Sequence, residues 1–114
     1  MKVAIIGSRT FFDKSKLIQQ MDNLQNISLI VSGGARGADT MGEQYARERN
    51  IPTKIFLPDW ERFGKSAGFK RNVQIIEAAD MVVAFWDGKS AGTKHSIELA
   101  KRSGKECKIV LFTV

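Results

Sequence analysis

The chain has 114 residues, of which 43% are hydrophobic and 26% charged. It is therefore large enough for one hydrophobic core and too small for two, and we expect a single domain over residues 1–114. The net charge of +6 is spread evenly, with eight basic and five acidic residues in 1–57 and ten and seven in 58–114, which fits an anionic partner or solubility alone. A single cysteine and no long apolar run exclude an internal disulfide and a membrane span, so we expect a cytoplasmic protein without membrane contacts.

Short apolar runs alternate with amphipathic segments along the chain. Runs that are apolar on both faces predict buried strands, and apolar residues spaced three and four apart predict helices. In chain order we predict a strand at 2–6, a helix at 14–24, a strand at 28–32, a helix at 38–48, a strand at 53–57, a loop at 58–66, a helix at 67–79, a strand at 81–86, a helix at 93–102 and a strand at 108–114.

Three side-chain placements accompany these elements. We expect Trp60 and Phe63 to turn inward from the loop. The helix at 67–79 is expected to bury a stripe of Phe69, Val73, Ile76 and Ala79. Thr93 is the expected N-cap of the helix that follows it.

Strands that alternate with helices predict an α/β fold of three layers, in which helices cover both faces of a mostly parallel five-stranded sheet. Right-handed crossovers favour the strand order 3-2-1-4-5. Ligands of such sheets bind beyond the carboxyl ends of the strands, here between the first and fourth strands. The segments that follow the strands are therefore the candidates for a site.

The segment after the first strand is Gly7-Ser8-Arg9. A glycine lets a ligand approach the backbone, and the hydroxyl and guanidinium that follow suit a phosphate. The alternative is a tight turn with a surface arginine.

The segment after the second strand is rich in small residues and leads into a helix. Such a turn exposes backbone N–H groups where the helix dipole favours an anion. Asp39 lies in the first helical turn, where it either compensates the dipole or accepts a hydrogen bond from a ribose hydroxyl or a base. The segment consists of Ser32, Gly33, Gly34, Ala35, Arg36, Gly37, Ala38 and Asp39.

The segment after the fourth strand contains Asp87, Gly88, Ser90, Gly92 and Thr93. It ends like a phosphate-binding P-loop, but a valine stands where the first glycine of that motif is required. We therefore predict a second Gly-rich anion cradle that opens the next helix.

Basic residues and carboxylates complete the candidate site. Arg71 and Asn72 are expected to face the same crevice, with a solvated helix end as the alternative. Asp39 and Asp87 are the candidate catalytic groups. Four cations are expected to converge on the crevice, namely Arg9, Arg36, Arg71 and Lys89.

These segments, together with Pro58, Trp60 and Gly68, resemble the SLOG superfamily, a Rossmann-like group that joins the DNA-processing protein A family with the LOG phosphoribohydrolases. The chain is most similar to the small stand-alone YspA-type members. The resemblance implies a pocket for a nucleotide or an ADP-ribose-like ligand. Ser96 stands where LOG enzymes carry an essential glutamate, which argues against LOG-type phosphoribohydrolysis.

We therefore expect a module that senses or sequesters a small phosphorylated nucleoside ligand, with no metal. The alternatives are a hydrolase that cleaves the N-glycosidic or phosphate bond of such a ligand, and a protein that binds single-stranded nucleic acid. A homodimer is expected on analogy alone.

Overall fold

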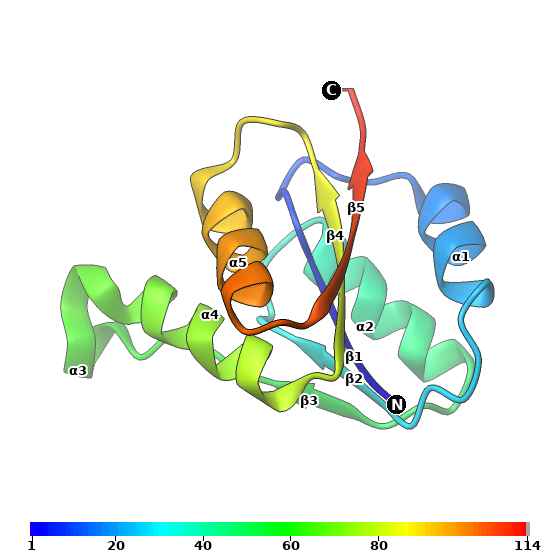
Figure 1. The fold of residues 1–114 in the computed structure, drawn as a ribbon, viewed down its shortest axis with the longest axis horizontal. Coiled ribbons are helices and arrows are strands. Elements are labelled where there is room, and N and C mark those ends of the chain that lie inside the picture. The colour runs from blue at the N-terminus through cyan, green and yellow to red at the C-terminus, as the bar shows by residue number, and fades with distance from the viewer. Residues whose placement is uncertain (114) are drawn as a thin grey trace.

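A computed structural model describes residues 1–113 and shows five parallel strands in the order β3-β2-β1-β4-β5 (Figure 1). The predicted α/β fold and strand order are confirmed. In chain order the elements are β1 (Lys2–Gly7), α1 (Lys14–Asp22), β2 (Leu29–Ser32), α2 (Ala38–Glu48), β3 (Thr53–Ile55), α3 (Trp60–Phe63), the 3₁₀ turn η1 (Gly64–Ser66), α4 (Ala67–Ala78), β4 (Met81–Trp86), α5 (Ala91–Arg102) and β5 (Glu106–Leu111).

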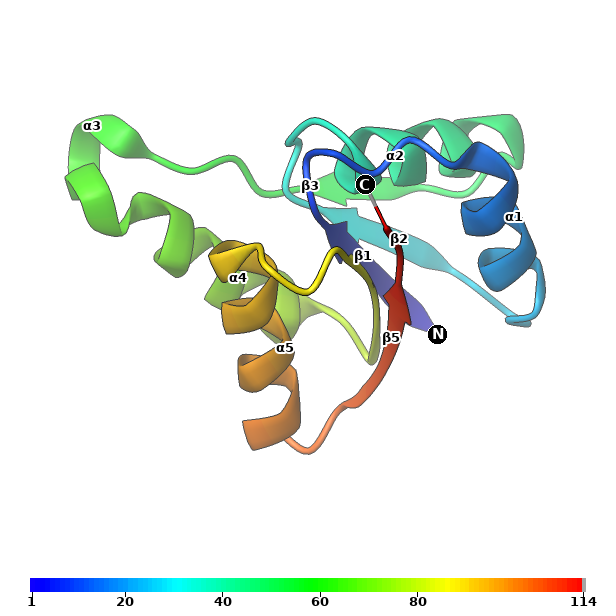
Figure 2. The same cartoon turned by 90° about the horizontal axis from the view of Figure 1, so that it is seen from above.

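Two hydrophobic clusters, one on each face of the sheet, make the three layers (Figure 2). Successive side chains of a strand point to opposite faces. Val3 and Ile5 of β1 accordingly pack in the cluster with α1 and α2, whereas Ala4 and Ile6 pack in the cluster with α4 and α5. Because β1 is buried on both faces, its end is fixed from both sides.

The ends of β1 and β4 lie side by side at the switch point of the sheet. Gly7 pairs with Phe85 in the parallel register, and Ser8 N donates to Phe85 O at 2.9 Å. A Cβ at Gly7 would overlap that carbonyl oxygen. Glycine is therefore required at position 7, where β1 ends beside β4.

The segment at 58–66, named the arm hereafter, differs most from the prediction. It is not an inward-packed loop but contains α3 and η1, and it projects away from the sheet (Figures 1 and 2). Asp59 caps α3 by accepting from Arg62 N at 3.1 Å. Trp60 is 58% exposed and Phe63 36% exposed, so their predicted inward placement is wrong.

Other element ends shift by a few residues. The strand predicted at 53–57 ends at Ile55, and the last strand begins at Glu106 and ends at Leu111, while Val114 lies outside the described residues. The predicted buried stripe of the helix at 67–79 is confirmed for Ile76 and Ala79 and is wrong for Phe69 and Val73, which are exposed. The helix also buries Ala67, Asn72 and Ile75. Among residues 1–113, every helix is too short or too polar to cross a lipid bilayer.

Candidate functional site

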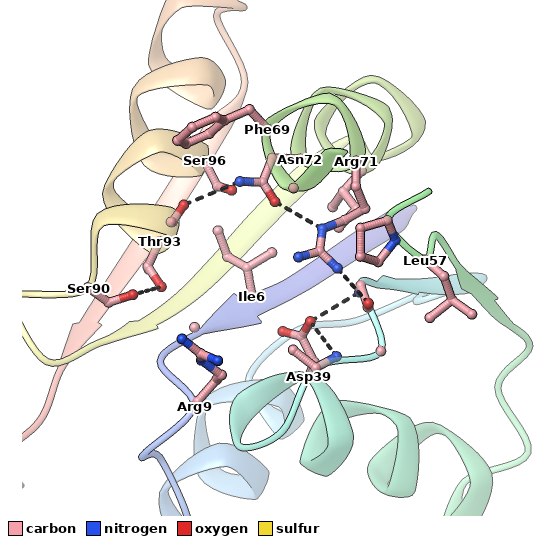
Figure 3. Close-up of a pocket in the computed structure, with 18 of the residues that line it drawn as sticks. Ile6, Arg9, Asp39, Leu57, Phe69, Arg71, Asn72, Ser90, Thr93 and Ser96 are labelled. Atoms are coloured by element: carbon pink, nitrogen blue, oxygen red, sulfur yellow. Dashed lines mark hydrogen bonds between the residues drawn. The ribbon is translucent and has the colours of Figure 1, made fainter. Parts of the chain in front are cut away.

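A pocket of about 470 Å³ opens beyond the carboxyl ends of the strands, between β1, the turn after β2, the arm, α4 and the start of α5 (Figure 3). The structure brings most of the predicted site residues into its lining. These residues are Gly7, Arg9, Gly33, Gly34, Ala35, Asp39, Arg71, Asn72, Ser90, Gly92 and Thr93.

Seven residues expected at the crevice are not part of the lining, namely Ser8, Ser32, Arg36, Gly37, Asp87, Gly88 and Lys89. Ser8 is buried, and its hydroxyl accepts from Asp87 N at 3.2 Å. Ser32 is also buried and donates to Glu43 Oε2 at 2.8 Å. Arg36 and Lys89 are exposed outside the pocket, so the expected convergence of four cations is wrong for two of them.

The turn after β2 closes on a carboxylate of its own. Asp39 Oδ2 accepts from Gly33 N and from Ala35 N, each at 3.2 Å. Gly34 N donates to Ser32 Oγ at 3.3 Å. The N–H groups of Gly33, Gly34 and Ala35, which we expected to hold a ligand anion, are thus already paired, and we call this segment (residues 33–37) the closed turn.

Asp39 is almost fully buried, with 6% of its surface exposed. Burial raises the pKa of Asp39 from 3.8 to about 6, and the hydrogen bonds from Ala35 and Gly33 and the charge of Arg71 limit the rise. Since it lines the pocket, this carboxyl can accept a hydrogen bond from a ligand and can exchange a proton near neutral pH.

The turn after β4 remains open at the helix that follows. Asp87 Oδ1 accepts from Lys89 N and Ser90 N, each at 2.8 Å, and these bonds lower the pKa of Asp87. Beyond them, among residues 1–113, the N–H groups of Ala91, Gly92 and Thr93 have no acceptor. We call this segment (residues 87–93) the open turn.

The cap of α5 explains why these groups stay free. Ser90, not Thr93 as predicted, occupies the N-cap position, because the helix begins at Ala91. The Ser90 hydroxyl bonds to Thr93 Oγ1 at 3.2 Å rather than to a backbone N–H. A Cβ built at Gly92 would meet no heavy atom within 4 Å, so the pocket is open at this point.

Two consecutive residues of α4 tie the closed turn to the open turn. Arg71 Nη1 donates to Gly33 O at 2.6 Å, and Arg71 Nε donates to Asn72 Oδ1 at 3.2 Å. Asn72 Nδ2 lies 3.5 Å from Gly92 O and 3.3 Å from His95 Nδ1. The predicted pair therefore fixes the spacing of the two turns (Figure 3).

Residues 1–63 match the family model described as the YspA, cpYpsA-related SLOG family. The chain belongs to this SLOG family. It is also 35% identical over 113 residues to the gene 61 protein of Mycobacterium phage D29, with 90% of each chain covered. Among solved structures, DNA processing protein A from Streptococcus pneumoniae superposes with a TM-score of 0.82 over 99% of this chain at 20% identity, a likeness of fold alone, and this chain spans about half its length.

In this SLOG protein the pocket also contains residues that the sequence did not assign to it: Ile6, Leu57, Pro58, Trp60, Lys65, Gly68, Phe69, Ile75 and Ser96. Most of them come from the arm, which the sequence predicts to be an inward-packed loop, and from the start of α4, where it predicts a buried stripe. Pro58, Trp60 and Gly68 belong to the motifs that carry the SLOG resemblance, so the resemblance could have assigned these three residues to the site. Lys65 joins Arg9 and Arg71 as the basic residues of the lining, against Asp39 as its acid.

Proposed function

We propose that the protein binds a phosphorylated nucleoside ligand, a nucleotide or an ADP-ribose-like molecule, in this pocket, and acts as a sensor or sequestering module. The observation that carries the proposal is the open turn, where three unpaired N–H groups begin the twelve-residue helix α5 beside the pocket. Unpaired N–H groups and the helix dipole together favour a phosphate. Family membership and the fold support a ligand of this class.

Arg9 supplies the charge for that phosphate. It lines the pocket, it is exposed, and among residues 1–113 it forms no hydrogen bond or salt bridge. A guanidinium that is not held by the protein is available to pair with two phosphate oxygens at once.

Asp39 suits the nucleoside end of the ligand, because a carboxylate accepts hydrogen bonds and repels a phosphate. Its Oδ2 is occupied by the closed turn, whereas its Oδ1 has no hydrogen-bond partner among the described residues. A ribose hydroxyl or a base amino group fits this free oxygen. The pocket thus distinguishes the phosphate end of the ligand from its nucleoside end.

Thermal shift with AMP, ADP, ADP-ribose, NAD and inorganic phosphate tests the proposal, because a ligand that binds the native state raises Tm. We expect at least one nucleotide to raise Tm for the wild type. Arg9→Ala and Gly92→Leu are expected to abolish the shift, since they remove the cation and fill the open space. Arg36→Ala, an exposed arginine outside the pocket, is the matched control and retains it. The absence of any shift in the wild type contradicts the proposal.

Hydrolysis of the bound ligand is the second candidate, favoured by a buried carboxyl with a pKa of about 6 in the pocket. Asp39 would move a proton during attack of water on the N-glycosidic or phosphate bond. Asp87, the other candidate, lies outside the lining and binds Lys89 N and Ser90 N. Asp39→Asn keeps an oxygen for the closed turn but cannot transfer a proton. Mass spectrometry of incubated ligands decides the question, because product from the wild type alone supports hydrolysis and unchanged ligand contradicts it.

Single-stranded nucleic acid is a third candidate, favoured by the exposed aromatic and basic residues of the arm. Two cations approach the ring of Phe63, with Lys70 Nζ at 4.8 Å and Arg62 Cζ at 5.0 Å from its centroid. Basic grooves with exposed aromatics bind single strands. Fluorescence anisotropy with a labelled oligonucleotide at about 50 and 200 mM salt tests this, and binding that is absent or insensitive to salt contradicts it.

A further inference from the structure

Trp60 in the arm has no structural role that accounts for its exposure. Its side chain is 58% exposed although it lines the pocket, and its indole N–H has no acceptor among residues 1–113. Trp86 behaves differently, because it packs against the core and its Nε1 donates to Ser90 O at 3.1 Å. A large apolar ring left in water at the edge of a pocket is the expected state of a residue that awaits a partner.

The arm holds this indole in a defined place. Asp59 caps α3, Phe63 N donates to Asp59 O at 3.0 Å, and Ser66 Oγ donates to Phe63 O at 2.9 Å. Gly68 at the start of α4 lies directly beside the ring, since a Cβ there would be 3.6 Å from Trp60 Cη2. The hydrogen bonds fix the backbone that carries Trp60, and the edge of its ring lies against Gly68.

The lining around Trp60 is apolar and aromatic. Leu57 is 67% exposed and Phe69 is 51% exposed, and both line the pocket. The Phe69 ring packs edge-on against His95, with centroids 4.6 Å apart and an interplanar angle of 72°. These residues offer ring faces and apolar surface to the pocket, whereas Arg9 and the open turn offer a cation and free N–H groups. Leu57, Phe69 and Arg9 border the pocket on different sides (Figure 3).

We infer that Trp60 is the stacking platform for the base of the ligand, so that the pocket selects phosphates that carry a planar ring over sugar phosphates that lack one. This inference rests on the proposed function and adds a specificity-determining residue to it. Stacking on an aromatic side chain tolerates any base, because every base has a π-face. The arm accordingly sets the class of ligand, and the two turns hold its phosphate and its hydroxyl groups.

Calorimetric titration separates the two ends of the ligand. The probes are ribose 5-phosphate and the four nucleoside monophosphates, and the proteins are the wild type, Trp60→Ala, Trp60→Phe and Phe12→Ala. Phe12, at 70% exposed and outside the pocket, is the matched control for loss of an exposed ring. In the wild type we expect at least one monophosphate to bind about 10-fold more tightly than ribose 5-phosphate.

The variants then assign that difference to Trp60. Trp60→Ala is expected to weaken the nucleotide about 10-fold and leave ribose 5-phosphate unchanged, while Trp60→Phe retains most of the gain and Phe12→Ala retains all of it. The unchanged affinity for ribose 5-phosphate also shows that Trp60→Ala is folded.

The outcomes distinguish this inference from the proposed function on which it rests. If no probe binds the wild type, both are overturned. If nucleotide and ribose 5-phosphate bind equally well, or if Trp60→Ala weakens both alike, the pocket binds phosphate as proposed and the assignment of Trp60 is overturned. Light scattering provides a further test. A wild-type dimer that Trp60→Ala converts to a monomer would show that a second copy covers the ring, and the assignment of Trp60 to the base would be overturned.

Discussion

The closed turn and the open turn have similar composition and the same position relative to a strand and a helix, yet only the open turn leaves free the N–H groups of residues that line the pocket. In the closed turn Asp39 folds back and accepts from Gly33 N and Ala35 N. In the open turn Asp87 pairs with the residues before the helix and leaves the N–H groups of α5 unpaired. A Gly-rich turn before a helix is therefore an anion site only where no side chain supplies the acceptor first.

The largest expected difference between the turns concerns Gly37 and Gly88. Gly37 has φ of +77°, and a Cβ there would overlap the Ser8 carbonyl oxygen and crowd the backbone of Arg9. Gly88 has φ of +82° and no heavy atom within 4 Å of such a Cβ. We expect Gly37→Ala to lower the free energy of unfolding by about 3 kcal/mol or more, and Gly88→Ala by about 1 kcal/mol, in urea titrations. Equal losses would show that crowding around Gly37 is unimportant.

The next difference is in pH dependence. The folded-state pKa of Asp39, about 6, lies above its ordinary value of 3.8, so the native state holds the proton more tightly and the cost of burying the charge disappears as the pH falls. Between about pH 7 and 4.5 the wild type should therefore gain about 2 kcal/mol of stability relative to Asp39→Asn. The pKa of Asp87 is lowered from 3.8, so its contribution to stability is lost only below about pH 4, and the wild type and Asp87→Asn should give parallel curves between about pH 7 and 4.5. Parallel curves for the wild type and Asp39→Asn would contradict the assignment.

Arg71 provides a smaller effect that is confined to the closed turn. Its guanidinium donates to Gly33 O at 2.6 Å, so Arg71→Ala leaves that carbonyl without its partner and removes a charge that favours ionised Asp39. A loss of about 1–2 kcal/mol is expected in thermal or urea unfolding. Lys70→Ala, the neighbouring cation, is the control and should change stability by less than about 0.5 kcal/mol.

The smallest expected effect on stability is at Gly92 in the open turn. Because a Cβ there meets no neighbour, Gly92→Ala should alter the free energy of unfolding by less than about 0.5 kcal/mol. The same substitution places a methyl group in the open space beside the unpaired N–H groups, and nucleotide affinity should fall. A large loss of stability would indicate that the open turn is packed as tightly as the closed one.

Much of the fold could be predicted because the relevant patterns are local. The boundaries of α2 and β4 agree with the predicted 38–48 and 81–86, since their apolar spacing is unambiguous. The arm could not be predicted in this way, because Trp60 and Phe63 resemble core residues and a four-residue helix has too few positions to show a period.

For the candidate site, the rule that ligands bind at strand ends identified the right segments but not their hydrogen bonding. The pairing of Asp39 with Gly33 and Ala35 depends on how the turn folds in three dimensions, and the sequence left the role of Asp39 open. Lys65 and Phe69 enter the lining only because the arm projects and then returns to α4.

The register of α4 is set by polar contacts as well as by the apolar side chains of Ile75 and Ile76, which pack in the core. Arg71 and Asn72 point about 100° apart around the helix, so a rotation that keeps one contact loses the other. The contacts of Arg71 and Asn72 with the two turns therefore fix the position of α4, whatever the number of residues in the arm. A longer or shorter arm could therefore connect β3 to α4 without moving the polar groups of the pocket. A change in arm length is thus a way to alter which ligands the pocket accepts while its polar groups stay in place.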